Sequence, residues 1–348
     1  MRTCRFVVLP VVSLISLSTL MAGPATGEEA TGAAPGTGAK SSGGVTQITE
    51  FPVPTPSSRP YQIVTGPDGN LWFTESDAGK IGRITPAGAI TEYPIRPGSG
   101  PYGITVGPDG NLWFTERYAN MIAKFSTAGS LLAEYPVPTD NSQPWGITTG
   151  PDGALWFTEE EVDQIGRITV NGSIIEFFTQ SCCFPTFISL GGDGRLWFTE
   201  ELPGQIGAMS TNGAVEYFTP PTAQLTYGIT TAPDGVVWFT ALAGDNKIGK
   251  IESNGQITEF PVPSTGTGIA GVTGGSDGNM WFTENDTGQV GGLRPEGSLI
   301  GLFQDGSYPI GITGGPDGNI WIAESQTNAI GRLYIRLTRG AGPGGVSG

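Results

Sequence analysis

One phrase, of the form GPDGNLWFTE, occurs seven times in the 348 residues, and this repeat constrains the fold more than any other feature. Its aspartates follow one another at intervals of 40 to 43 residues, and each is followed four residues later by a tryptophan. A period of this length with turn residues inside it is typical of propeller blades made of four short strands. The sequence therefore predicts an all-β fold, a seven-bladed β-propeller. The tryptophans are Trp72, Trp113, Trp156, Trp197, Trp238, Trp281 and Trp321.

The second copy shows how one unit is built. We expect strands at 102–106, 112–115, 121–125 and 132–137, with a tight turn at 107–110 where proline sets φ and glycine accepts positive φ. Because side chains alternate along a strand, the Trp and Phe of each WF pair should point to opposite faces. We therefore expect these aromatic residues to fill the space between neighbouring blades.

The two ends of the repeat region complement each other. The last copy is followed by one more predicted strand, at 330–334, and then by a Gly-rich tail. The missing fourth strand is found at 48–54, where ITEFPVP repeats the residues at 257–263. We expect this N-terminal strand to pair into the last blade, which would close the ring and cover an exposed sheet edge.

The first residues are typical of a secretory signal peptide rather than of the fold. Arg2 and Arg5 precede an apolar run at 6–21, and small residues follow it. We therefore divide the chain into a signal peptide (1–25), a flexible linker (26–44), the propeller (45–337) and a Gly-rich tail (338–348). The mature protein is expected to be secreted or otherwise extracytoplasmic.

The charge of the chain bears on its partners. The formal net charge is −15. A surface this acidic repels phosphate backbones and anionic lipids, so we expect neither a nucleic acid nor a membrane partner. We expect a monomer.

Ligands of propellers bind at the mouth of the central channel, where the loops entering the inner strands meet. Four blades place an aromatic residue there, just before or within the phrase Gly-Ile-Thr or its equivalent: Tyr61, Tyr102, Trp145 and Tyr227. Blades six and seven place Ala270 and Ile310 there instead. Flat aromatic faces with polar tips suit a small ring-bearing molecule, a glycan or a peptide. The alternative is that the four rings plug the channel and contact only one another.

A set of carboxylates ends the second strand of most blades, and we expect it near the same mouth. Its members are Glu75, Glu116, Glu159, Glu200, Glu284 and Glu324. Such charges need partners if they are partly buried. Basic residues recur on the third strands: Arg83, Lys124, Arg167, Lys250 and Arg332. The simplest hypothesis pairs the two sets.

That pairing cannot hold in two blades, because Ala208 and Gly292 replace the basic residue there. Glu200 and Glu284 then lack the expected partner. A hard cation such as Mg²⁺ or Ca²⁺ suits oxygen ligands, so Glu284 is a candidate metal ligand, although structural pairing remains the alternative for most of the set.

Two adjacent cysteines, Cys182 and Cys183, lie in the loop that enters the inner strand of blade four. Exported proteins normally oxidise paired thiols, which favours a disulfide between these two. Intermolecular bonding and free thiols are the alternatives, because adjacent cysteines close only a strained ring.

The phrases PYGIT, GPDGNLWFTE, IGRIT and ITEYP together resemble the virginiamycin B lyase family, over about residues 45 to 335. The resemblance implies an enzyme that linearises cyclic depsipeptide antibiotics by elimination. In that family Mg²⁺ polarises the ester and a histidine removes the neighbouring α-proton. Tyr61 matches a substrate-side tyrosine of the family, and Glu324 matches an acidic residue, which makes it a second candidate metal ligand.

The chain departs from the family's pattern where the chemistry is expected. Ala270 and Ile310 stand where the family has its two histidines, and Tyr308 replaces a metal-associated glutamate. The chain contains no histidine at all. A histidine base titrates near neutral pH without special tuning, whereas a glutamate needs a raised pKa to do the same work.

Three functions follow as hypotheses. The first is an exported propeller that binds a ligand or partner through a degenerate lyase site, without catalytic residues. The second is an active metal-dependent carbon–oxygen lyase that uses carboxylates. The third is a structural or interaction module that binds through its other face. The replacements at Ala270 and Ile310 favour the first over the second.

Overall fold

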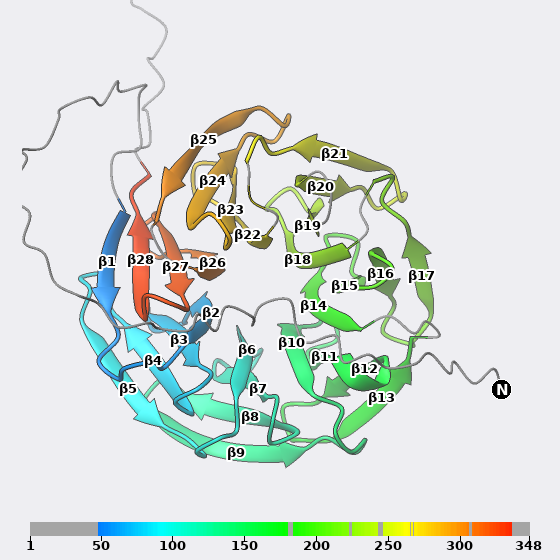
Figure 1. The fold of residues 1–348 in the computed structure, drawn as a ribbon. Helices are drawn as coiled ribbons and strands as arrows, with labels where there is room; N and C mark the ends of the chain where they lie inside the picture. Colours follow the sequence, from blue (N-terminus) through cyan, green and yellow to red (C-terminus); the bar gives the residue numbers. More distant parts are fainter. Residues whose placement is uncertain are drawn as a thin grey trace, which may run out of the picture. The chain divides into compact units, whose positions relative to one another are not determined.

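The computed structural model describes residues 48–179, 184–222, 225–242, 246–264, 266, 268–305 and 308–335. These residues form seven four-stranded antiparallel sheets, arranged in a ring around a central channel (Figure 1). The predicted seven-bladed propeller is thereby confirmed. The only helix among the described residues is the short 3₁₀ turn η1 (Glu160–Val162).

The blades run in chain order, each from an inner to an outer strand. Blades 1 and 2 contain β2 (Pro60–Thr65), β3 (Leu71–Glu75), β4 (Lys80–Ile84), β5 (Ile90–Pro94), β6 (Pro101–Val106), β7 (Leu112–Glu116), β8 (Met121–Ser126) and β9 (Ser130–Pro136). Blades 3 and 4 contain β10 (Pro144–Thr149), β11 (Leu155–Glu159), β12 (Gln164–Ile168), β13 (Ile174–Phe178), β14 (Pro185–Leu190), β15 (Leu196–Glu200), β16 (Gln205–Met209) and β17 (Val215–Phe218). Blades 5 and 6 contain β18 (Leu225–Thr231), β19 (Val237–Leu242), β20 (Lys247–Ile251), β21 (Ile257–Pro261), β22 (Ile269–Gly274), β23 (Met280–Glu284), β24 (Gln289–Leu293) and β25 (Leu299–Gln304). Blade 7 contains β26 (Pro309–Gly314), β27 (Ile320–Glu324), β28 (Ala329–Leu333) and β1 (Ile48–Pro52).

The repeated phrase folds as a turn that holds its own tryptophan. In blade 1, Asp68 Oδ1 accepts hydrogen bonds from the backbone N–H of Asn70 and from the indole Nε1 of Trp72, at 3.2 and 3.1 Å. Gly69 takes φ +75°, a conformation that favours glycine. The Asp-to-Trp spacing of the sequence therefore reflects a side-chain hydrogen bond across the turn.

The WF pairs build the core between blades, as their alternation predicts. Trp113 packs toward blade 3 against Ile147 and Phe157. Phe114 packs on the other face, against Trp72 and Ile81 of blade 1. Both side chains are fully buried. Blades 1 to 6 thus contribute one aromatic residue to each of their two interfaces, whereas blade 7 has Ile322 in place of the phenylalanine.

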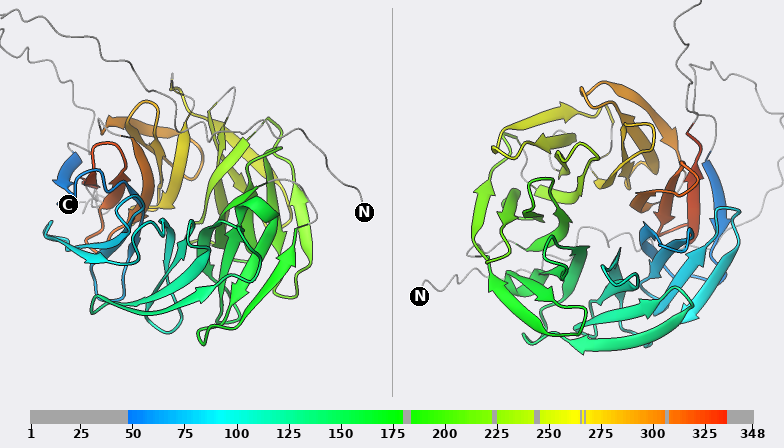
Figure 2. Two further views of the ribbon diagram at one scale, coloured as in Figure 1. Left: turned by 60° about the horizontal axis from the view of Figure 1, so that its bottom comes forward. Right: turned by 180° about the vertical axis from the view of Figure 1, so that it is seen from behind.

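The ring closes through the N-terminal strand. Strand β1 pairs antiparallel with β28, with Ile48 opposite Leu333 and Pro52 opposite Ala329, which confirms the predicted closure. The two strands lie side by side at the rim in all views (Figure 2). Asn328 fastens the chain beyond β1, because its side chain accepts from the backbone N–H of Ser58 and donates to the carbonyl of Thr55.

Several sequence predictions fall outside the described residues. They are the signal peptide, the linker, the tail beyond residue 335 and the proposed disulfide between Cys182 and Cys183. Within the described ranges, no helix has the length and apolarity needed to cross a bilayer.

Candidate functional site

The channel mouth is shaped by a bulge at the start of every inner strand. In blade 1 the register with β3 shifts between Pro60 and Ile63, so Tyr61 is left out of the regular ladder. A bulge re-aims side chains. The same shift occurs in the other six blades, which turns the corresponding residues toward the channel axis.

The threonine of each WFTE phrase fixes these bulges to the next blade. Thr115 Oγ1 accepts from the backbone N–H of Gly103 at 2.9 Å and donates to the carbonyl of Trp145 at 2.7 Å. Equivalent bonds to the next blade are made by Thr74, Thr158, Thr199, Thr240 and Thr283. Blade 7 has Ala323 instead, and there Ser325 Oγ donates to the carbonyl of Pro60. The repeat pattern alone did not predict a role for these threonines.

The predicted mouth residues converge into one buried group, the mouth cluster, which consists of Tyr61, Tyr102, Trp145, Tyr227, Ala270 and Ile310. The rings of Tyr61 and Tyr102 are 4.3 Å apart, and those of Tyr102 and Trp145 are 5.0 Å apart. The hydroxyls of Tyr61 and Tyr227 hydrogen-bond at 2.6 Å. The four rings therefore contact one another as a closed layer, as the alternative of a channel plug requires. Their role in ligand binding stays a prediction.

Below this layer, the channel is narrow. Its cavity is lined mainly by backbone and aliphatic residues of the inner strands, including Gly103, Ile147 and Val272. Its volume of about 190 Å³ is smaller than the roughly 300 Å³ at which pockets for drug-sized ligands begin. A drug-sized ligand therefore does not fit inside this cavity.

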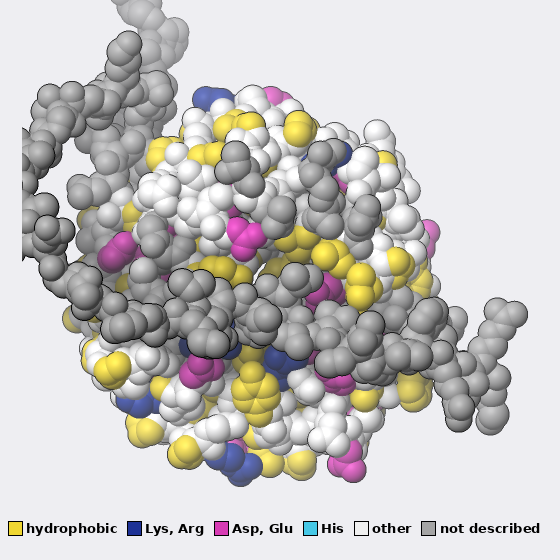
Figure 3. Space-filling model, viewed as in Figure 1, with side chains coloured by type: hydrophobic (Ala, Val, Ile, Leu, Met, Phe, Trp, Pro, Cys, Tyr) yellow, Lys and Arg dark blue, Asp and Glu magenta, His cyan; other side chains and the backbone are white. Residues whose placement is uncertain are grey.

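A second layer of residues above the rings was missed by sequence reasoning. These residues directly follow the WFTE phrase, where the chain leaves the second strand. The guanidinium of Arg117 lies 4.2 Å from the ring centre of Trp145 and forms an ion pair of 2.5 Å with Glu160. Basic, acidic and hydrophobic side chains lie together around the middle of this end of the ring (Figure 3). The signal was present in the sequence: residues at this position vary between blades, from Ser76 to Arg117, Glu160, Glu201, Leu242, Asn285 and Ser325.

Two carboxyls of this second layer have shifted pKa values. Burial raises the pKa of Glu160 to about 7, although Arg117 opposes the shift. Burial also raises the pKa of Glu201, again against the effect of Arg117. A carboxyl that titrates near pH 7 can exchange a proton at neutral pH.

The loops of blades 6 and 7 form a separate polar pocket. It is lined by Asn285, Asp286, Thr287, Gly288, Gln304, Tyr308 and Gln326, and its volume is about 350 Å³. Tyr308 also packs against the mouth cluster, so this pocket adjoins the wall formed by Ala270 and Ile310. Amide, hydroxyl and carboxylate groups give it hydrogen-bonding capacity for a hydroxyl- or amide-rich ligand.

The predicted pairing of the WFTE glutamates with third-strand cations is wrong. Those cations lie over the tryptophans and reach the turn aspartates: Lys124 pairs with Asp109 at 2.7 Å and Arg167 with Asp152 at 2.6 Å. The reason is the period of a strand. Trp113 and Lys124 are opposite each other and share a face, whereas Glu116 is three residues from Trp113 and points to the other face.

The WFTE glutamates do not join the mouth cluster either. Those of blades 1 to 3 are buried close to a second carboxyl from the fourth strand of the same blade. The pKa of Glu75 is raised to about 8, mainly by burial and also by the nearby carboxyl of Glu92. Burial and Glu176 raise the pKa of Glu159 to about 8 as well. These carboxyls are therefore largely protonated at neutral pH, which explains how they are tolerated in the interior.

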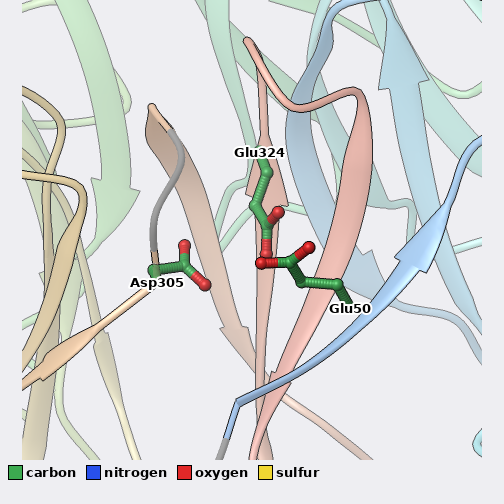
Figure 4. Close-up of side chains that lie close together, drawn as sticks. All are labelled: Glu50, Asp305 and Glu324. Atoms are coloured by element: carbon green, nitrogen blue, oxygen red, sulfur yellow. The ribbon is translucent and has the colours of Figure 1, made fainter. Parts of the chain in front are cut away.

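The two predicted metal ligands lie in different surroundings. Glu284 Oε2 accepts a hydrogen bond of 2.9 Å from Thr287. Glu324 faces Glu50 and Asp305 instead, as Figure 4 shows. Oε2 of Glu324 also accepts a bond of 2.7 Å from Thr327. Among the described residues, Glu284 is not part of the carboxylate group that contains Glu324.

Fold and site together define a closed seven-bladed propeller with an aromatic mouth and a polar pocket beside it. The model of the virginiamycin B lyase family matches residues 40–181 and 178–338. A solved streptogramin B lyase is 35% identical, with a TM-score of 0.79, and the alignment covers 84% of this chain and 98% of that one. The chain belongs to the virginiamycin B lyase family.

Other similarities agree with this membership. A virginiamycin B lyase from Staphylococcus aureus, solved as a catalytically inactive histidine-to-alanine variant with quinupristin, is 35% identical with a TM-score of 0.78, over 83% of this chain and 99% of that one. A virginiamycin B lyase of Bordetella parapertussis is 43% identical over 49 residues, which is 14% of this chain and only 16% of that protein. A match to hydrazine synthase of Kuenenia stuttgartiensis, at 16% identity and a TM-score of 0.72, shows the fold alone.

Proposed function

We propose that this chain is an exported propeller that binds a polar, ring-bearing ligand at its channel mouth and has lost lyase activity. One observation carries the second half of the proposal: the chain has no histidine. At the two positions where the family resemblance places histidines, Ala270 and Ile310 are buried in the apolar mouth cluster. Neither side chain can accept a proton.

The phenols of the mouth cluster do not replace a histidine base. Burial and the neighbouring phenols raise the pKa of Tyr61, and burial raises that of Tyr227, so both phenols stay protonated at neutral pH. The solved relative from Staphylococcus aureus is described as catalytically inactive when one histidine is changed to alanine. By analogy, a chain without histidine is expected to lack turnover.

The mouth is also a poor fit for the family's Mg²⁺. Tyr308 offers a phenol where the family has a metal-associated glutamate, and burial raises the pKa of this phenol, which disfavours the anion that a metal needs. The other matched ligand, Glu324, points toward Glu50 and Asp305 rather than to the mouth cluster. We therefore derive no step through a metal at the mouth.

Binding is supported by polar atoms left for a ligand. The indole Nε1 of Trp145 is buried and donates to no described residue. In the pocket of blades 6 and 7, Oδ1 of Asn285 is buried and accepts from no described residue. Buried polar atoms are normally hydrogen-bonded, so both atoms are suited to contact a bound molecule. A glycan or a small peptide offers the matching donors and acceptors.

The loss of activity is tested with a type B streptogramin and Mg²⁺ at neutral pH. Elimination opens the ring without a change in mass, because the α-proton and the ester oxygen both remain in the product, whereas hydrolysis adds water. The assay therefore needs chromatographic separation of ring and linear isomers before mass analysis. We expect conversion equal to a buffer blank. Linearisation that depends on this protein would overturn the proposal.

Binding is tested by tryptophan fluorescence during titration with aromatic, glycan and peptide ligands. We expect one class to change the emission of the native chain, and the change to disappear in Trp145→Phe, which retains ring packing. Phe178→Ala is the control, because Phe178 is exposed on the outer strand β13. If no ligand class produces a change that depends on Trp145, the closed aromatic layer is only a plug.

One observation favours the alternative of an active lyase: the pKa of Glu160 is about 7, beside the mouth cluster. Such a carboxylate could remove an α-proton while the C–O electrons leave with the ester oxygen. If turnover is found, we expect Glu160→Gln to abolish it. The exposed neighbour Glu161 provides the control, Glu161→Gln.

A further inference from the structure

Three carboxylates from distant parts of the chain meet where the ring closes. Glu50 lies on β1, Asp305 follows β25, and Glu324 ends β27. One oxygen of each lies within 4.8 Å of the others. Figure 4 shows the three groups pointing toward one another from the first strand, the end of blade 6 and the last blade. We call these residues the seam cluster.

The seam cluster lacks the cation that occupies the same place in blades 1 and 5. In blade 1, Lys80 stands opposite Glu75 and pairs with Glu92 at 3.6 Å. In blade 5, Lys247 pairs likewise with Glu259 at 3.6 Å. In blade 7 the residue opposite Glu324 is Ala329. Among the ion pairs of the described residues, none contains Glu50 or Glu324.

A second observation points to a ligand. Glu324 is fully buried, and its Oε1 receives no hydrogen bond from the described residues. The backbone beside it is Gly331, where a Cβ would lie 2.3 Å from this oxygen and 3.4 Å from Oδ1 of Asp305. Oε1 of Glu324 therefore lies in the space that a side chain at position 331 would fill. A buried carboxyl oxygen without a donor, next to two more carboxyls, is costly in the ionised form. Such a group either keeps a proton, as Glu75 and Glu159 do, or binds a positive group.

We propose that Glu50, Asp305 and Glu324 bind a calcium ion. Ca²⁺ takes oxygen ligands at 2.3–2.6 Å, so two ligands on opposite sides of it are about 4.6–5.2 Å apart. Mg²⁺ ligands at 2.0–2.1 Å span only about 4.2 Å. Separations within 4.8 Å therefore lie inside the span that Ca²⁺ allows. Waters complete its coordination on the exposed side, where Glu50 lies.

The ion would join three segments that no covalent bond connects at this point. Because Glu50 belongs to β1, calcium would hold the N-terminal strand to the blade that it completes. This role is structural and belongs to the seam between the first and last strands. It does not depend on ligand binding or catalysis at the mouth, so failure of the proposed function leaves it intact.

The experiment measures thermal unfolding of the full chain, first treated with a chelator and then titrated with Ca²⁺ to about 1 mM, a range in which extracellular modules bind calcium. We expect a saturable rise in Tm of several degrees, because binding to the folded state stabilises it. Glu50→Gln and Asp305→Asn should each weaken the apparent affinity at least tenfold. The matched control is Glu92→Gln, which changes the same strand position in blade 1 and should leave the calcium response unchanged.

Isothermal titration calorimetry then counts the ions, with one per chain expected. The proposal is overturned if calcium leaves Tm unchanged. It is equally overturned if the response persists in Glu50→Gln and Asp305→Asn, or if Mg²⁺ gives the same stabilisation at the same concentration.

Discussion

Six blades carry a small arrangement of three residues: a turn aspartate, a tryptophan and a cation over the indole. Blade 6, with Gly292 on its third strand, shows no such cation among the described residues. In blades 2 and 3 the cation comes from the third strand, as Lys124 and Arg167. Blade 4 has Ala208 there, and Arg195 from the turn takes its place, 4.6 Å from the ring of Trp197 and 2.7 Å from Asp193. The arrangement is thus conserved between blades although the residue that supplies the charge is not.

Because Arg195 supplies the charge in blade 4, a basic residue introduced at position 208 should restore the stability that is lost when Arg195 is replaced. Arg195→Asn should lower the free energy of unfolding by about 1–2 kcal/mol, because it removes a cation–π contact and a partly buried ion pair. The double variant Arg195→Asn/Ala208→Arg should recover most of the loss, since it rebuilds the arrangement of blade 1, where Arg83 lies over Trp72. Urea unfolding of the three proteins tests this. A double variant that is less stable than Arg195→Asn would contradict it.

At the scale of elements, the outer strands connect neighbouring blades. The aromatic residue of each fourth strand stacks on its own blade's tryptophan, as Phe218 does on Trp197 at 5.4 Å. In blade 7 this residue is Phe51 of β1, which stacks on Trp321 at 5.6 Å. Phe51 also covers Gly88 of blade 1, where φ is +93° and a Cβ would lie 2.1 Å from the ring. Strand β1 therefore contacts both sides of the seam.

Phe51→Ala should cost about 2–3 kcal/mol of stability, a typical range for loss of a packed aromatic ring. Phe218→Ala is the matched control, because the same stack is removed within a blade whose strands are continuous. We expect only Phe51→Ala to accelerate amide exchange in β28, since β1 is attached there by pairing alone. Equal exchange in both variants would show that closure does not depend on this ring.

The repeat predicts the elements better than it predicts the site. Turn, tryptophan and strand spacing depend on local contacts, so 28 strands and the closure by β1 follow from the sequence. The predicted pairing of the WFTE glutamates with third-strand cations was wrong, because Trp113 and Glu116 point to opposite faces of the blade. The closed mouth depends on bulges at Tyr61 and its equivalents, and on contacts between blades, which a periodic pattern does not contain.

For the whole molecule, buried acids set the response to pH. Burial raises the pKa of Glu116 from 4.5 to about 7, as it raises those of Glu75 and Glu159 to about 8. The turn aspartates behave oppositely: although burial opposes it, hydrogen bonds from Asn70 and Trp72 lower the pKa of Asp68. The buried glutamates therefore favour the folded state while they are protonated, and the turn aspartates favour it while they are ionised.

The sign of the pH dependence follows. Between about pH 4.5 and pH 8 the unfolded chain has released protons that the folded glutamates retain, so the free energy of unfolding falls as pH rises. Below about pH 4 the free energy of unfolding decreases as the pH falls, because the turn aspartates become protonated. We expect the highest Tm near pH 4 to 5. Glu159→Gln should raise Tm at pH 8 and leave it nearly unchanged at pH 5, whereas Glu161→Gln should do neither. A Tm that rises from pH 5 to pH 8 would contradict this.

Closure by β1 also imposes an order of assembly. Ser58, just beyond this strand, hydrogen-bonds to Asn328, 270 residues later in the chain. Contacts between residues so far apart are slow to form, because most of the chain must be ordered before they can be made. A growing or translocating polypeptide would therefore hold its first strand without a partner until the seventh blade emerges. During that interval the unpaired strand would be a natural binding segment for chaperones, and truncation of the last blade would leave it permanently exposed.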